Sequence, residues 1–265
     1  MAGYNDIAFR TLCIKAGAGL AYTGMINPLS RARFALGDRP AVQLFTESGR
    51  GVGAFMKKHA SEAALFDLNL GCAAPVARKK RFGSYLDDLD VIEKTLKAMR
   101  DAAATAGKPV TLKMRKTAKA MEIVALAEKH CDAVCIHPRT RSQGYGGEPD
   151  MAFALSVRDA VSIPVIYSGN VGIANGLQLL KDFDFVMIGR NALGNPGIFA
   201  ALAGKRCSIG FDDYLKLAQR HGLPFNQIRL HAMHFARGMT GASRLRLALS
   251  KTRNEERIRT LLEGH

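Results

Sequence analysis

The stretch Leu65-Phe66-Asp67-Leu68-Asn69-Leu70-Gly71-Cys72 resembles a β-strand that ends on a reactive side chain. Two more strand-like runs follow at helix-sized intervals, one ending Thr111-Leu112-Lys113-Met114-Arg115 and the next ending Ile136-His137-Pro138-Arg139-Thr140-Arg141. Strands that alternate with helices indicate a parallel α/β barrel, in which the carboxyl ends of the strands converge on one active site. We therefore expect Cys72, Lys113 and His137 to surround one pocket.

The rest of the first two hundred residues supports this reading. Helical patterns separate the apolar runs, and proline at positions 109 and 164 stands just before two of them, where it interrupts no ladder. The predicted helices include Asp88–Ala106, Ala118–His130 and Met151–Val161. The predicted strands are Gly19–Met25, Ala41–Phe45, Leu65–Gly71, Val110–Arg115, Ala133–His137, Val165–Asn170 and Phe185–Arg190.

Seven strands are one fewer than a closed (β/α)8 barrel of the TIM type contains. The chain opens with Met1-Ala2-Gly3-Tyr4-Asn5-Asp6, and Asn5 or Asp6 is a good N-cap for a helix over Asp6–Ala16. Either the given sequence begins inside the first strand, which is then truncated, or another segment closes the wall of the barrel; we expect the first.

The strand pattern stops after about residue 204. Four helices are predicted beyond it: Asp212–Arg220, Gln227–Gly238, Ala242–Ser250 and Asn254–Glu263. The predicted organisation is a catalytic barrel over residues 1–204 and a small, basic helical domain over residues 205–265.

Composition narrows the class of protein. With 265 residues, 48% of them hydrophobic, the chain can bury one substantial core. No apolar run is long enough to cross a membrane, and the first residues lack the pattern of a signal peptide. Five scattered cysteines without a C-x-x-C pair favour a reducing cytoplasm, and they argue against a disulfide framework and against a metal site.

The formal net charge of +15 indicates a polyanionic partner, nucleic acid before an anionic membrane. A soluble protein from an organism with generally basic proteins is the alternative. The position of the charge favours the first reading, because Arg78-Lys79-Lys80-Arg81 lies just beyond Cys72 and the C-terminal stretch is also basic. Its cations are Arg229, Arg237, Arg244, Arg246, Lys251, Arg253, Arg257 and Arg259.

Cys72 is the candidate for chemistry. Free cysteine is usually buried and inert, and Cys13, Cys131 and Cys135 fit that description. Cys72 fits it less well, because Asn69 and a basic loop are its neighbours. A thiol of ordinary pKa is mostly protonated at neutral pH, so it can act as an acid or as a nucleophile.

Two turns near the ends of the last strands carry glycine. They are Ser168-Gly169-Asn170 and Gly189-Arg190. In barrels the loops after strands seven and eight frequently hold a phosphate through backbone N–H groups, and glycine permits the close approach. Ordinary turn chemistry is the alternative for either turn alone. Together they indicate a phosphorylated cofactor or substrate.

The combination of motifs resembles the tRNA-dihydrouridine synthases, in family order and over essentially the whole chain. The C-terminal Met239-Thr240-Gly241-Ala242 with Leu245-Arg246 is also similar to that family. The barrel motifs are Met1-Ala2-Gly3, Gln43-Leu44-Phe45, Leu68-Asn69-Leu70-Gly71-Cys72, Val110-Thr111-Leu112-Lys113-Met114-Arg115, His137-Pro138-Arg139-Thr140-Arg141-Ser142-Gln143-Gly144-Tyr145, Ile163-Pro164-Val165-Ile166, Ser168-Gly169-Asn170 and Met187-Ile188-Gly189-Arg190-Asn191-Ala192-Leu193-Gly194-Asn195-Pro196.

The resemblance implies an FMN-bound barrel that reduces the C5–C6 double bond of uridines in tRNA, with NADPH re-reducing the flavin. It gives Cys72 the role of proton donor and Asn69 that of orienting the uracil. The implied flavin-binding residues are Met1, Ala2, Gln43, Lys113, His137, Ser168, Gly169, Asn170, Gly189 and Arg190. The basic loop formed by Arg78, Lys79, Lys80 and Arg81 suits contacts with the RNA backbone, and Arg139 and Tyr145 are the further predicted RNA-binding residues.

Besides the truncated first strand, the chain departs from the family pattern at two places. Ala73-Ala74-Pro75 stands where proline usually follows the cysteine directly, and Gly24 replaces an acidic residue common in the second strand. We expect a cytoplasmic monomer that binds no metal and no membrane. Two other functions stay open: an FMN barrel that reduces a small pyrimidine or enone, and a tRNA-binding protein without redox chemistry.

Overall fold

The computed structural model describes residues 3–263, which form two compact units. One unit is Met25–Ile188, and the other joins residues 3–24 to residues 189–263. The boundary predicted at residue 204 stays a prediction.

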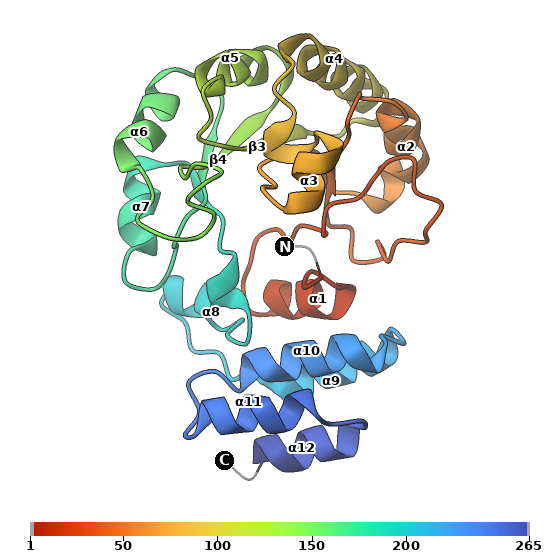
Figure 1. The fold of residues 1–265 in the computed structure, drawn as a ribbon, viewed down its shortest axis with the longest axis vertical. Coiled ribbons are helices and arrows are strands. Elements are labelled where there is room, and N and C mark those ends of the chain that lie inside the picture. The colour runs from red at the N-terminus through yellow and green to blue at the C-terminus, as the bar shows by residue number, and fades with distance from the viewer. Residues whose placement is uncertain (1–2, 264–265) are drawn as a thin grey trace. The chain divides into compact units, whose positions relative to one another are not determined.

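The unit Met25–Ile188 contains one parallel sheet in which sequence order and spatial order agree. A helix follows each of the first five strands, which is the repeating pattern of a (β/α) barrel wall (Figure 1). The strands are β1 (Ala41–Leu44), β2 (Leu65–Leu70), β3 (Val110–Arg115), β4 (Ala133–His137), β5 (Val165–Tyr167) and β6 (Phe185–Val186).

Side chains along these strands alternate between an apolar and a polar face. Phe66, Leu68 and Leu70 of β2 belong to the hydrophobic core, together with Leu112 and Met114 of β3. The residues between them are polar or charged: Asp67 and Asn69 on β2, and Thr111, Lys113 and Arg115 on β3. The apolar face holds the sheet against its helices, and the opposite face collects the groups that can do chemistry.

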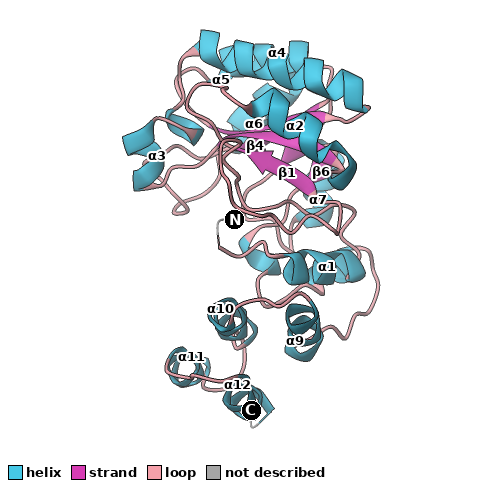
Figure 2. Cartoon of the chain, turned by 90° about the vertical axis from the view of Figure 1, so that its right-hand side faces the viewer, coloured by secondary structure: helices cyan, strands magenta, loops and turns pink. Residues whose placement is uncertain are grey.

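Four helices pack their apolar faces onto the sheet (Figures 1 and 2). The longest, α4, starts where the Asp88 side chain accepts from the N–H groups of Asp90 and Val91, and it stops at Gly107, whose φ of 60° is left-handed. The four are α2 (Val52–His59), α4 (Leu89–Ala106), α5 (Ala120–His130) and α6 (Met151–Asp159). The unit also contains the shorter helices α3 (Pro75–Lys80) and α7 (Gly176–Asp182) and two 3-10 helices, η1 (Ala60–Glu62) and η2 (Gly83–Tyr85).

Three strand predictions need correction. No strand forms over Gly19–Met25; Ile26 beyond it makes an isolated parallel bridge to Leu44, and Pro28 follows closely. Proline has no N–H to donate, so that ladder cannot extend. The other two strands are shorter than predicted, β5 ending at Tyr167 and β6 at Val186, because the glycine-containing segments beyond them turn.

The second unit is helical. The predicted helix Asp6–Ala16 is confirmed as α1 (Ile7–Lys15), and the four predicted C-terminal helices are confirmed, with no end shifted by more than three residues. Among the described residues, no helix is both long and apolar enough to span a membrane. The unit also contains η3 (Arg190–Ala192), α8 (Ile198–Leu202), α9 (Phe211–Arg220), α10 (Phe225–Phe235), α11 (Ala242–Ser250) and α12 (Glu255–Glu263).

Asp6 joins α1 to α9 and α10. Its Oδ1 accepts from the N–H of Phe9 and caps α1, while its Oδ2 accepts from the Tyr214 hydroxyl at 3.2 Å and from Gln227 Nε2 at 2.9 Å. Nε2 of the fully buried His231 lies 2.9 Å from the same oxygen. Burial by itself raises the pKa of Asp6, but His231, the Phe9 N–H and Gln227 outweigh it, and the pKa is lowered.

We expect the Asp6→Asn variant to lower the free energy of unfolding at neutral pH by about 1–3 kcal/mol, because an amide nitrogen faces donors there. The folded state releases the Asp6 proton more readily than the unfolded chain. The stabilisation is therefore complete above the ordinary pKa of 3.8 and is lost as the pH falls below it. The wild-type stability curve should be steeper than that of the variant below pH 4.

Urea denaturation followed by circular dichroism measures this, since the chain has no tryptophan. Asp212→Asn is the control, because Asp212 lies exposed in the first turn of α9. The prediction would be contradicted if the free energy of unfolding fell equally steeply with pH below pH 4 in the wild type and in the Asp6 variant.

Candidate active site

The register of the sheet places the polar residues of neighbouring strands opposite one another. Gln43 is paired with Asp67, Asn69 with Lys113, and Lys113 in turn with Cys135. Arg115 is paired with His137 at the end of the next strand. Parallel pairing therefore brings Gln43, Asn69, Lys113 and His137 to adjoining strands of one sheet, as the sequence predicts.

A continuous line of hydrogen bonds runs through this polar face. Gln43 Nε2 donates to Asp67 Oδ2 at 2.8 Å, and Asn69 Nδ2 donates to Gln43 Oε1 at 2.7 Å. Asn69 Oδ1 then accepts from the backbone N–H groups of Gly71 and Cys72, at 3.1 and 2.9 Å. The line starts at a buried carboxylate and ends at the cysteine.

Cys72 itself is half-buried, and its backbone is held from both sides. Its N–H is bound by Asn69, and its carbonyl accepts from both the N–H and the hydroxyl of Ser84. Gly83 has a φ of 61°, and a Cβ there would lie 2.7 Å from Cys72 Cβ, so this approach requires glycine. Pro75 lies at the start of α3, and Ala73 and Ala74 connect it to the fixed cysteine.

The other thiols differ in their surroundings. Burial raises the pKa of Cys13, Cys131 and Cys135 to about 12, so these side chains stay protonated and shielded. Cys207 is exposed. Cys72 is the only one of these five that stands at the carboxyl end of a strand beside a polar face, which supports the choice made from sequence.

Lys113 and His137 supply the cation and the imidazole of this face. Lys113 is half-buried, and its charge acts on both Asp67 and Cys135. His137 is buried, with Nε2 3.4 Å from Arg139 Nη1, and its ring lies 6.2 Å from that of Tyr145. The Tyr145 side chain is 61% exposed, so it offers an open aromatic surface next to the buried imidazole.

Arg139 is placed differently from its predicted role in binding RNA. It is fully buried, and its guanidinium donates to the carbonyls of Gly146 and Gly147. These bonds, together with the His137 contact, use nitrogen atoms that an RNA phosphate would need. The structure favours a role in holding the loop over residues 140–147 instead of direct contact with RNA.

Arg115 is a site residue that the sequence reasoning missed. It is buried, Nε donates to the Gly71 carbonyl at 2.8 Å, and Nη1 donates to the carbonyls of Thr140 and Gly144. Its guanidinium carbon also lies 5.4 Å from the centre of the Tyr145 ring. Arg115 therefore connects the cysteine loop to the Tyr145 loop. Its position two residues beyond Lys113, on the same face of β3, was the available signal.

The turn Ser168-Gly169-Asn170 follows β5. Ser168 N–H donates to the Ile136 carbonyl, and Asn170 adopts a left-handed conformation with φ 48°. Asn175 fixes the turn, since its Nδ2 donates to the Asn170 carbonyl. A Cβ at Gly169 would lie 3.4 Å from both Pro149 Cγ and the Tyr167 hydroxyl, so a larger residue would be crowded.

The remaining predicted flavin residues lie outside this unit. Gly189 and Arg190 belong to the helical unit, where Gly189 precedes η3 and its carbonyl accepts from the Ala192 N–H. Met1 and Ala2 lie outside the described residues.

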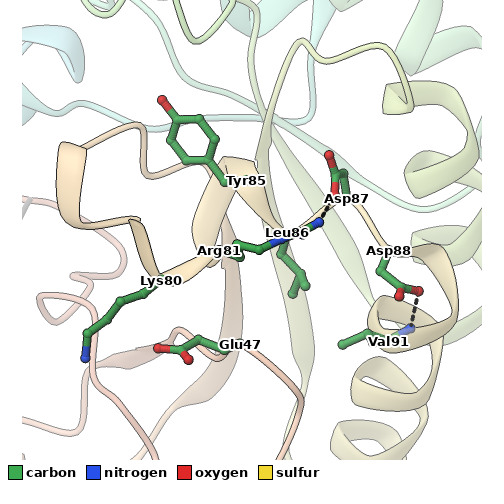
Figure 3. A pocket seen from close by; sticks show the side chains of 8 residues that line it. All are labelled: Glu47, Lys80, Arg81, Tyr85, Leu86, Asp87, Asp88 and Val91. Atoms are coloured by element: carbon green, nitrogen blue, oxygen red, sulfur yellow. Dashed lines mark hydrogen bonds and ion pairs between the residues drawn. The ribbon is translucent and has the colours of Figure 1, made fainter. Parts of the chain in front are cut away.

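The basic run is exposed on and after α3. Arg78, Lys79 and Lys80 are open to solvent, whereas Arg81 pairs with Asp87 at 3.5 Å. Arg81, Asp87 and Lys80 all line a cavity of about 350 Å³, and Figure 3 shows the ion pair between the first two. Asp87, Asp88 and Glu47 also line the cavity, so Arg81 is partly neutralised, whereas Arg78 and Lys79 do not line it and are better placed for phosphate.

No group of three or more His, Cys, Asp or Glu side chains in residues 3–263 is arranged to hold a metal ion.

Comparison with known proteins agrees with these features. Two solved structures share the fold at low sequence identity: a morphinone reductase variant in complex with tetrahydroNAD (TM-score 0.53, 13% identity, 77% of this chain and 83% of that one) and a variant of NCR from Zymomonas mobilis (TM-score 0.52, 9% identity, 81% and 88%). The parallel sheet with alternating helices and the helical C-terminal region confirm the predicted fold class.

Curated relatives are closer in sequence. The chain is 35% identical over 221 residues to tRNA-dihydrouridine synthase B of Serratia marcescens and 35% identical over 222 residues to that of Yersinia pestis. The Escherichia coli protein of the same name is 34% identical over 221 residues. The matches cover 75% of this chain but only 65% of the Serratia protein and 68% of the other two.

A sequence model of the dihydrouridine synthase (Dus) family matches residues 1–261. The chain therefore belongs to the dihydrouridine synthase family.

Proposed function

We propose that this protein is an FMN-dependent oxidoreductase that reduces the C5–C6 double bond of uridines in tRNA, with NADPH as the reductant. The observation that carries the proposal is the placement of Cys72. In a chain of this family, its thiol stands at the end of β2, and hydrogen bonds to Asn69 and Ser84 fix its backbone.

The polar face of the sheet fits a flavin mononucleotide. Gln43, Lys113 and His137 offer an amide, a cation and an imidazole, which suit the carbonyl and nitrogen edge of the ring. The turn at Gly169 and Asn170 combines a closely packed glycine with a left-handed residue, a backbone arrangement that suits a phosphate. Ser168, Gly189 and Arg190 are the further proposed phosphate residues, and Met1 and Ala2 the further ring contacts.

Bound there, FMN supplies the hydride for the pyrimidine ring. The chain supplies the proton and the orientation. Cys72 is proposed as the acid that protonates C5, because its backbone is fixed while its side chain is half-open. Asn69 Nδ2 carries a second hydrogen besides the one given to Gln43, and this N–H is proposed to hold a uracil oxygen.

A uridine in folded RNA has to leave its stack to reach such a site. Tyr145 offers an exposed ring for stacking, and Arg78, Lys79 and Lys80 offer exposed charges for the backbone. The basic residues of the C-terminal helices are proposed as further phosphate contacts, and most of them are exposed: Arg237, Arg244, Lys251, Arg253, Arg257 and Arg259. The protein is proposed to act in the cytoplasm as a monomer.

The direct test uses purified protein, FMN, NADPH and tRNA from cells that lack dihydrouridine. We expect NADPH-dependent dihydrouridine in the tRNA and no comparable turnover of free uridine. Robust turnover of uridine alone would favour a small-molecule reductase. A protein that binds tRNA but retains no flavin after reconstitution would favour a binding function without redox chemistry.

Replacing Cys72 with alanine should remove the proton donor and leave the cofactor site intact. We expect dihydrouridine formation to fall by about 100-fold or more, the range typical of a lost general acid, with flavin absorbance and tRNA binding unchanged. Cys207→Ser is the control, because Cys207 is exposed and stands apart from the polar face in sequence. Near-normal turnover in the Cys72 variant would exclude the thiol as the acid.

The double variant Lys79→Gln/Lys80→Gln should bind tRNA more weakly, and its binding should depend less on salt. The slope of log K against log salt should fall by about 0.9 for each phosphate that the variant no longer neutralises, if the duplex DNA value applies to tRNA. Lys57→Gln/Lys58→Gln is a matched control, because these two lysines are likewise exposed in the last turn of a helix. Equal slopes for the two double variants would show that Lys79 and Lys80 do not bind phosphate.

A further inference from the structure

Asp67 is a fully buried carboxylate that the proposed chemistry leaves without a role. It lies in the middle of β2, and its oxygens accept from Gln43 Nε2 at 2.8 Å and from the Thr111 hydroxyl at 2.6 Å. Burial raises the pKa of Asp67 to about 6, although Thr111, Gln43 and the charge of Lys113 act in the opposite direction. A buried acid costs stability, so its place in this face calls for an explanation.

The line of hydrogen bonds has Asp67 at one end and the backbone N–H groups of Gly71 and Cys72 at the other. The chemistry of these two ends fixes the direction of every hydrogen bond between them. The oxygen of Asp67 that faces Gln43 can only accept while the group is ionised, so Gln43 must turn its nitrogen toward Asp67 and its oxygen toward Asn69. Asn69 must then offer its nitrogen to Gln43. That leaves its Oδ1 for the backbone N–H groups of Gly71 and Cys72, which can only donate.

Both ends therefore require the same orientation of both amides. An apolar residue at position 67 would remove the constraint at one end, and Gln43 could then turn over. A turned Gln43 would present a nitrogen to Asn69 and draw the Asn69 oxygen away from Gly71 and Cys72. Two backbone N–H groups of the cysteine loop would lose their acceptor, which destabilises the present conformation of the loop.

We propose that Asp67 is a positioning residue, which through Gln43 and Asn69 fixes the backbone of Cys72 and thus the place of its thiol. The catalytic consequence rests on the function proposed above; the positioning of the thiol does not. Asp67 touches neither cofactor nor substrate in this scheme and acts only through the two amides.

We call the hydrogen bonds from Asp67 through Gln43 and Asn69 to the backbone of Cys72 the relay. The relay also predicts which substitution of Asp67 is tolerated. Asparagine at position 67 can accept from Gln43 with its oxygen and offer its nitrogen to the Thr111 hydroxyl, which can accept. Asp67→Asn thus retains the direction of the relay while it removes the charge near Lys113. Asp67→Leu removes both, and Gln43→Met breaks the next link. Thr111→Val is the packing control, because it deletes the second hydrogen bond of Asp67 and leaves the relay.

The first readout is the rate at which iodoacetamide alkylates Cys72, measured in a Cys207→Ser background, since the exposed Cys207 would react as well. Cys13, Cys131 and Cys135 are buried and stay silent. The second readout separates kcat from KM for tRNA, in flavin-loaded protein.

We expect alkylation of Cys72 to become several-fold faster in Asp67→Leu and in Gln43→Met, as the loop loosens. Asp67→Asn and Thr111→Val should stay within about twofold of the parent. In Asp67→Leu, kcat should fall by about 10-fold to 100-fold, the range produced by small misplacements of a reacting group, with KM for tRNA nearly unchanged. If Asp67→Leu does not fold, Gln43→Met gives the same alkylation test.

Three results would overturn the proposal: parental alkylation rates in both Asp67→Leu and Gln43→Met, equal impairment of Asp67→Asn and Asp67→Leu, or equal impairment of Thr111→Val and Asp67→Leu. The second would assign the effect to charge, and the third to packing. If the parent protein forms no dihydrouridine, the proposed function fails, and the alkylation rates still decide whether Asp67 positions Cys72.

Discussion

The alternation of side chains along each strand is the constraint on which this structure depends. Phe66, Leu68 and Leu70 pack into the core under the helices, and the alternate residues Asp67 and Asn69 lie on the other face of the sheet. A shift of β2 by one residue would bury a carboxylate among apolar side chains and turn a phenyl ring into the polar face. Hydrophobic packing on one side thus sets the position of the hydrogen-bonding groups on the other, and the fold and the candidate site share one determinant.

A polar face enclosed by a sheet is stable only when its groups are paired. Here much of the pairing goes to main-chain atoms of the loops and not to other side chains. Arg115 and Arg139 give their N–H groups to carbonyls of Gly71, Thr140, Gly144, Gly146 and Gly147. Cations that sequence inspection assigns to a ligand are therefore used in part to hold the loops that surround it.

The sequence predicts the regular parts of this protein well. Six of the seven predicted strands and every named helix exist, because apolar periodicity, N-caps such as Asp6 and proline before a strand are local signals. The prediction over Gly19–Met25 was wrong because the segment is strand-like in composition but makes only an isolated bridge at Tyr22. The bridge at Ile26 cannot extend further along the chain, because Pro28 has no N–H to donate. For the site, order along the chain indicated Cys72, Lys113 and His137. It could not show that Arg139 is buried or that Arg115 joins two loops, since both facts depend on where the loop over residues 140–147 returns.

Gly83 has a consequence for how tolerance to mutation should be interpreted in this protein. A side chain there would meet the Cβ of Cys72 at 2.7 Å and its carbonyl oxygen at 2.8 Å, and the left-handed backbone disfavours any other amino acid as well. In a saturation screen scored by activity, position 83 would look like a member of the catalytic set although it carries no functional group. Its intolerance would measure the space that the neighbouring thiol segment occupies.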